Sequence, residues 1–110
     1  MSGDPGLLRD ILTSIENIER YASRGKAEFL ADELIQTWIV HQLQTIGEAA
    51  SRVSETFRAN HREISWKQIV ALRQILLHDN FGINPASVWH SVENELPSLK
   101  KRIEIVLQTS

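Results

Sequence analysis

Residues 32–57, DELIQTWIVHQLQTIGEAASRVSETF, decide the fold of this chain. They lie in a run from about residue 27 to residue 59 that contains neither proline nor a glycine cluster, the longest helical pattern in the sequence. Asp32 is placed to cap the main helix, with residues 29 and 30 in a short leading turn. Apolar side chains recur at helical spacing and form a wide stripe, which is typical of a helix packed against several neighbours. The stripe comprises Leu34, Ile35, Trp38, Ile39, Leu43, Ile46, Ala49, Ala50, Val53 and Phe57.

Gly47 lies inside this helical run and is followed by the small side chains of Ala49 and Ala50. A glycine in a helix interior costs about 1 kcal/mol relative to alanine. A close approach of a second helix would compensate for that cost. We therefore expect another helix to cross at Gly47.

The first helix is expected to begin at Asp4-Pro5. Asp4 can accept from free backbone amides as N-cap, and Pro5 loses no hydrogen bond at the first helical position. Gly25 is expected to end this helix in a left-handed conformation. An apolar face follows from the spacing of Leu7, Leu8, Ile11, Leu12, Ile15 and Ile18.

A third helix is expected to begin at Ser65. Ser65 and Gln68 have the spacing of a capping box, while Ile64 and Ile69 occupy the positions of a hydrophobic staple. The following residues are apolar over most of the helix circumference, which predicts a buried central helix. Gly82 is expected to end it.

Asn84-Pro85 starts a further helix by the same combination of cap and proline. Pro97 cannot donate to the preceding turn, so it should kink or restart that helix. No stretch alternates with period two and no linker divides the chain. We therefore predict an all-α protein, an antiparallel bundle of four to five helices that forms a single domain over residues 1–110.

Composition narrows the class of protein. The 110 residues are 42% hydrophobic and 24% charged, which is typical of a soluble globular chain. The absence of cysteine excludes disulfides, thiolate nucleophiles and cysteine-ligated zinc. No apolar run approaches the ~20 residues that cross a bilayer, and no signal pattern opens the chain, so we expect a cytoplasmic protein without membrane contact. A net charge of −2 means that any RNA binding must use a local basic patch.

Arg73 and His78 are the candidates for catalysis. Histidine has a suitable pKa to remove the proton of an RNA 2′-hydroxyl, and arginine presents a planar fork to phosphate oxygens. Gln74 and Asp79 are placed to orient these groups. The two residues are five positions apart, about 140° around a regular helix, so they converge only if the helix unwinds, the arginine reaches round or two copies meet. Alternatively, both simply complement the dipole at a helix C-terminus.

Other constellations are weaker. His41 and Glu48 share a helix face, but no third ligand at metal spacing accompanies them, so we expect no metal site. His61 and Arg62 follow a helix end and are expected to be exposed to solvent. A local basic patch could draw on these two residues together with Arg52, Arg58 and Lys67.

Short stretches along the whole chain resemble, in their order, the HepT-like toxins of the HEPN superfamily, small prokaryotic all-α proteins. They are Leu8-Arg9-Asp10-Ile11-Leu12, Ile15-Glu16-Asn17-Ile18, Phe29-Leu30-Ala31-Asp32, Ile46-Gly47-Glu48-Ala49-Ala50, Ile64-Ser65-Trp66, Leu72-Arg73, Leu77-His78-Asp79, Phe81-Gly82-Ile83, Val88-Trp89 and Leu96-Pro97.

The resemblance implies a homodimer in which paired Arg73 and His78 segments form a ribonuclease site at the interface, without metal or cofactor. Gln74, Asp79 and Asn80 would be the supporting polar residues. It also implies a type VII HEPN/MNT toxin–antitoxin system, in which a minimal nucleotidyltransferase antitoxin neutralises the toxin by transferring AMP to a tyrosine two residues after the histidine. Asn80 occupies that position here and has no phenolic oxygen. The alternative is a catalytically impaired HEPN helical module that binds a nucleotidyltransferase.

Overall fold

The computed structural model describes residues 3–77 and 84–109 of the chain. Regular structure in these ranges is helical throughout, which confirms the predicted all-α bundle, although these ranges form seven helices where four to five were expected. The predicted helix end at Gly82 lies outside the described residues. The helices are α1 (Asp4–Ala22), α2 (Lys26–Ala31), α3 (Glu33–Ser51), α4 (Glu55–Asn60), α5 (Trp66–Leu77), α6 (Pro85–Asn94) and α7 (Leu96–Thr109).

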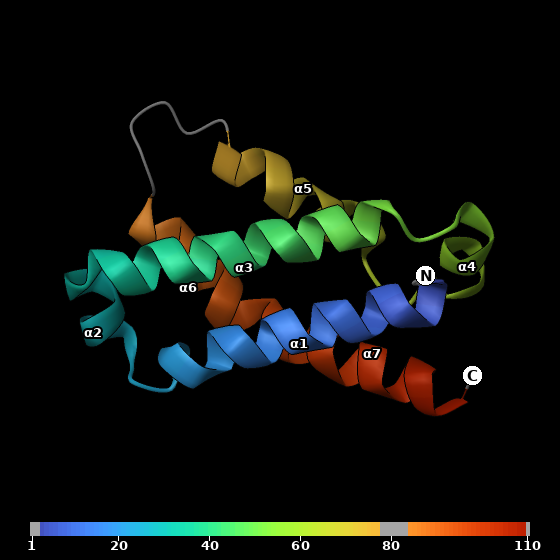
Figure 1. Ribbon diagram of the computed structural model, residues 1–110, viewed down its shortest axis with the longest axis horizontal. Helices are drawn as coiled ribbons and strands as arrows, with labels where there is room; N and C mark the ends of the chain where they lie inside the picture. Colours follow the sequence, from blue (N-terminus) through green and yellow to red (C-terminus); the bar gives the residue numbers. More distant parts are fainter. Residues whose placement is uncertain (1–2, 78–83, 110) are drawn as a thin grey trace.

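Helix α3 is the centre of the bundle. It lies between α1 and α5 and runs antiparallel to both, while α7 extends along α1 (Figure 1). The predicted apolar faces of α1 and α3 are confirmed, because their central side chains are wholly buried. Side chains with 0% exposure include Leu8, Ile11, Ile15, Ile18, Ile39, Leu43 and Ile46, joined by Ile103 of α7.

The stripe of α3 is narrower than its spacing predicts. Leu34 remains 81% exposed and Trp38 39% exposed. The first turns of α3 therefore present partly exposed apolar side chains, although Tyr21 of α1 lies against Trp38. Trp38 is held at this surface by its indole, which donates to the carbonyl of Asn17 (3.3 Å).

The long helical run divides into three helices. Asp32 caps α3 as predicted, since its carboxylate accepts from the amides of Leu34 (2.9 Å) and Ile35 (3.3 Å). The expected continuation to residue 59 is wrong, because α3 ends at Ser51 and a separate helix α4 follows. Ser54 supplies the local reason, since its hydroxyl accepts from the amide of Phe57 (3.1 Å) and caps α4.

The predicted capping role of Asp4 is also wrong. Gly3 is the N-cap of α1, and Asp4 lies in the first turn beside Pro5. Its carboxylate instead accepts from the amide (2.9 Å) and the hydroxyl (2.7 Å) of Ser54. Asp4 therefore ties the start of α1 to the turn that follows α3, a tertiary contact rather than a local cap.

Helix α5 is not the buried central helix that its composition predicts. It packs along α3 at the edge of the bundle (Figure 1). Lys67 and Gln68 are exposed, and Val70 and Ala71 are half-buried. Among the described side chains of α5, the apolar Val70 and Ala71 are therefore only partly covered.

The predicted helix starts after Ser65 and Asn84 and the restarted helix at Pro97 are confirmed. Asn84 caps α6 by accepting from the amides of Ala86 (3.1 Å) and Ser87 (3.3 Å), and Pro97 lies in the first turn of a restarted helix α7. The prediction that Gly25 ends the first helix in a left-handed conformation is wrong. Helix α1 ends at Ala22 with Ser23 as its C-cap, and Gly25, with a φ of 96° and an extended ψ of 166°, is the N-cap of α2.

An ion pair ties α7 to α1. The ammonium of Lys100 donates to the carboxylate of Glu19 (2.8 Å), and this hydrogen bond raises the pKa of Lys100 above its ordinary value. Among the described helices, none combines the length and apolar character needed to cross a membrane.

Candidate active site

Helices α3 and α5 approach each other closely at Gly47. A Cβ atom added to Gly47 would lie 2.9 Å from both the Cβ and the backbone nitrogen of Arg73, and 3.2 Å from the carbonyl oxygen of Ile69. The predicted helix crossing at Gly47 is therefore confirmed. The residue that crosses there is Arg73, so the backbone of the predicted catalytic arginine lies directly on α3.

Two residues of α3 bind the guanidinium of Arg73. Its Nη1 donates to Glu48 Oε2 (2.7 Å) and to Ser51 Oγ (3.3 Å). The distance to Glu48 is that of a short, charge-assisted hydrogen bond. About a third of the Arg73 side chain stays exposed (31%), so solvent and ligands can still reach the group.

The C-terminal turn of α3 is itself well organised. The hydroxyl of Ser51 donates to the carbonyl of Glu48 (2.6 Å), so its lone pairs are free to accept from Arg73. The guanidinium of Arg58 donates to the carbonyls of Ser51 (3.1 Å) and Val53 (3.0 Å). Carbonyls at the C-terminal end of a helix have no donor within the helix, so Arg58 satisfies them. The two residues that contact Arg73 thus belong to a hydrogen-bonded helix end.

Two of the five residues suggested for a basic patch, Arg58 and His61, are half-buried. Arg58 is half-buried and directed toward α3 carbonyls, so it is not available as a free surface cation. His61 is half-buried as well, with its ring 4.3 Å from that of Phe57, which corrects the expectation that it is exposed. Arg62, Arg52 and Lys67 are exposed, as expected.

Arg73 lines a groove of about 590 Å³ between α1 and α3. The groove carries two acidic side chains, Asp10 and Glu48, and two arginines, Arg52 and Arg73. Its other lining residues are Leu7, Thr13, Ser14, His41, Gln44, Thr45 and Ala49. His41 and Glu48, which share a face of α3, both line this groove. The carboxylate of Glu48 pairs with Arg73.

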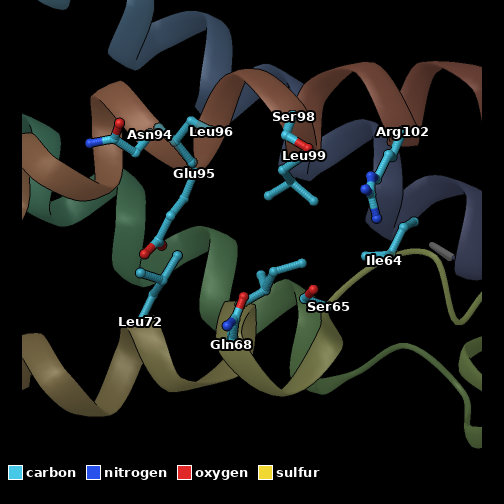
Figure 2. A pocket seen from close by; sticks show the side chains of 11 residues that line it. Ile64, Ser65, Gln68, Leu72, Asn94, Glu95, Leu96, Ser98, Leu99 and Arg102 are labelled. Atoms are coloured by element: carbon cyan, nitrogen blue, oxygen red, sulfur yellow. The ribbon is translucent and has the colours of Figure 1, made fainter.

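Two further clefts follow the other side of α5. Figure 2 shows the smaller, about 190 Å³, which is lined by Gln68 and Leu72 of α5 and by Leu99 and Arg102 of α7. The larger, about 510 Å³, lies between α5 and α6 and includes Ala71 and His90 together with Gln68 and Leu72. Arg73 lines neither cleft, so the candidate chemistry is on the α1–α3 side of α5.

The structure does not describe the side chains of the other predicted site residues. His78, Asp79 and Asn80 are outside the described residues, and Gln74 is described only as part of the α5 backbone. No cluster of three metal-ligating side chains occurs within residues 3–77 and 84–109. Sequence reasoning missed Glu48 and Ser51 as partners of Arg73. The only signal was their position one and four residues after Gly47, where a helix crossing was expected.

Substituting Gly47 with valine is expected to lower the free energy of unfolding by about 1–3 kcal/mol, because the new methyl groups would overlap the α5 backbone. Thermal unfolding followed by circular dichroism should show this as a melting temperature lower by roughly 4 °C for each kcal/mol. Thr45→Val is the matched control, since residue 45 is on the exposed face of α3. An unchanged melting temperature for Gly47→Val would contradict the close crossing.

Comparison with known proteins identifies the family. The model of the ribonuclease HepT-like family matches residues 11–106. A Thermococcus cleftensis protein named "Probable ribonuclease HepT" is 35% identical over 98 residues, which cover 88% of this chain and 89% of that protein. The Methanocaldococcus jannaschii protein "Putative RNase MJ1380" is 34% identical over 100 residues, which cover 90% of this chain and 92% of that protein. No solved structure gives a match. The chain therefore belongs to the HepT-like ribonuclease family.

Proposed function

We propose that this protein is the toxin of a type VII HEPN/MNT toxin–antitoxin system, a metal-independent endoribonuclease that acts in the cytoplasm. The endoribonuclease class follows from the family. Arg73 and His78 are proposed as the catalytic residues, with Gln74, Asp79 and Asn80 in support. Two copies of the chain would meet at this segment, so that the active site lies at a dimer interface.

The observation that carries the proposal is the placement of Arg73. Its backbone is packed on Gly47, its Nη1 is bound by α3, and its side chain remains partly exposed beside a groove. A cation held in this way can stabilise negative charge on a phosphate without having to reorganise during the reaction. The position of α5 at the edge of the bundle supports a dimer, because a second copy can cover its outer positions.

The proposed reaction is an attack within the RNA. His78 accepts the proton of a 2′-hydroxyl, and the resulting oxygen attacks the adjacent phosphorus. The bond from phosphorus to the 5′-oxygen breaks, and this oxygen takes a proton from a second, protonated imidazole, for which the dimer supplies a second His78. Arg73 offsets the charge of the dianionic phosphorane. The products are a 2′,3′-cyclic phosphate and a 5′-hydroxyl.

The proposed partner is a minimal nucleotidyltransferase that acts as the antitoxin. Because Asn80 has no phenolic oxygen to accept AMP, AMP transfer to residue 80 is not part of the proposal. Asn80 also favours a second candidate, a catalytically impaired module that binds the nucleotidyltransferase. Co-purification of the two proteins without any growth defect from this chain alone would support the module. A growth defect that depends on Arg73 would exclude it.

The nature of the products tests the proposed reaction. Purified protein is expected to cleave RNA in excess EDTA and to leave cyclic phosphate ends, which mass spectrometry of the fragments can identify. An RNA of the same sequence with 2′-O-methyl groups is the control, since it has no hydroxyl to attack and should stay intact. Cleavage of the methylated RNA, or products with 3′-hydroxyl ends, would contradict the mechanism.

A further inference from the structure

Among the residues that the structure describes, the partners of the Arg73 guanidinium lie on one side of it. Both of its hydrogen bonds to described residues leave from Nη1, toward Glu48 and Ser51. The edge formed by Nε and Nη2 makes no bond to a described residue. That edge carries two parallel N–H groups, the arrangement that matches two oxygens of one phosphate.

Glu48 is well placed to determine the direction of this free edge. It follows Gly47 directly, so its backbone lies at the helix crossing where Arg73 rests on α3. Its carboxylate is 2.7 Å from Nη1, while Ser51 one turn later binds the same nitrogen at 3.3 Å. Two acceptors on a single helical face restrict rotation of the guanidinium about the end of a long, flexible side chain.

The stability of the fold does not explain this ion pair. The side chains of Glu48 and Arg73 are 54% and 31% exposed, and ion pairs with such exposure add little to the free energy of unfolding. Glu48 also places negative charge near any RNA phosphate that approaches Arg73, which opposes binding. An acidic residue in this location is better suited to orienting the arginine than to attracting the substrate.

We propose that Glu48, assisted by Ser51, is a positioning residue that holds Nη1 of Arg73 so that the Nε–Nη2 edge faces the scissile phosphodiester of RNA. This inference rests on the proposed function. It assigns to Glu48 an effect on the catalytic step and not on substrate capture. A misplacement of about 1 Å in a catalytic group can cost about 100-fold in rate, which sets the scale of the effect.

The test separates kcat from KM for cleavage of a short RNA. Glu48→Ala is expected to lower kcat by about 10-fold to 100-fold. Its KM should stay equal or fall, because a negative charge near the substrate is removed. Glu48→Gln keeps an acceptor oxygen and should recover part of the lost kcat. An increase in KM with unchanged kcat would overturn the proposal.

Glu19→Ala is the matched control. Glu19 forms the corresponding inter-helix pair with Lys100 at 2.8 Å, with exposures of 48% and 27% that resemble those of the Glu48 pair. It should leave kcat unchanged. Equal losses of kcat in Glu19→Ala and Glu48→Ala would mean that any such ion pair has the same effect, and would overturn a positioning role.

A double substitution links the effect to Arg73. In an Arg73→Lys background, where no fork remains to be oriented, adding Glu48→Ala should change the residual kcat by less than twofold. Full multiplication of the two losses would show that Glu48 acts elsewhere. If Arg73→Ala cleaves RNA normally, the proposed function itself fails. If Arg73 is essential but Glu48→Ala keeps the normal kcat, only the positioning role fails.

Discussion

Replacing His78 with alanine is expected to lower the rate constant of RNA cleavage by about 10²–10⁴-fold, the range that general base catalysis contributes. Without the imidazole, the 2′-hydroxyl would have to lose its proton to water. Cleavage of a labelled RNA in EDTA, measured under single-turnover conditions, reports this step without a contribution from product release. Free imidazole should restore part of the rate, since it can occupy the space left by the side chain.

The control for this substitution is His90→Ala. His90 is an exposed histidine of α6, with its ring within hydrogen-bond distance of Asn94 (3.1 Å) and on the side of α5 away from Arg73. The rate of His90→Ala should stay close to that of the unchanged protein. Undiminished cleavage by His78→Ala would remove His78 from the mechanism, whatever the behaviour of Arg73.

Arg73→Ala is expected to reduce cleavage by about 10²–10³-fold, because one preorganised donor group to the transition state is lost. Arg73→Lys keeps the positive charge but not the planar fork, so it should recover only part of this loss. The same assay measures both variants. Their melting temperatures should change little, since exposed ion pairs contribute about 0–1 kcal/mol to stability.

Lys100→Ala is the control for the loss of charge. It removes one positive charge from the ion pair between α1 and α7 and leaves the α3–α5 crossing intact. Equal losses of activity in Lys100→Ala and Arg73→Ala would show that overall charge controls RNA binding. A normal rate for Arg73→Ala would contradict its assignment as a catalytic residue.

Local chemistry in the sequence predicted several helix starts. Asp32 and Asn84 cap the helices that follow them, and Pro97 restarts a helix. These predictions succeeded because a cap or a proline acts on backbone groups within one turn of itself. The apolar spacing of α1 likewise predicted its buried face, since a regular helix repeats every 3.6 residues.

Predictions that depended on distant partners were less successful. Asp4 has the residue type of an N-cap, but its carboxylate instead accepts hydrogen bonds from Ser54, 50 positions later in the chain. The apolar character of α5 indicated a central helix, whereas α3 occupies the centre and α5 lies at the edge. The composition of a helix indicates how much of its surface is apolar, but it does not determine which neighbouring helix covers that surface.

In the candidate site, too, local features were predictable from the sequence and contacts between helices were not. The sequence by itself determined an all-α chain of the HepT-like family, a helix crossing at Gly47 and Arg73 as the candidate cation. Only the tertiary structure decided that Arg73 is the residue at this crossing and that Glu48, 25 positions earlier, binds it. Helical periodicity relates residues within a few turns, whereas contacts between α3 and α5 depend on how the two helices pack.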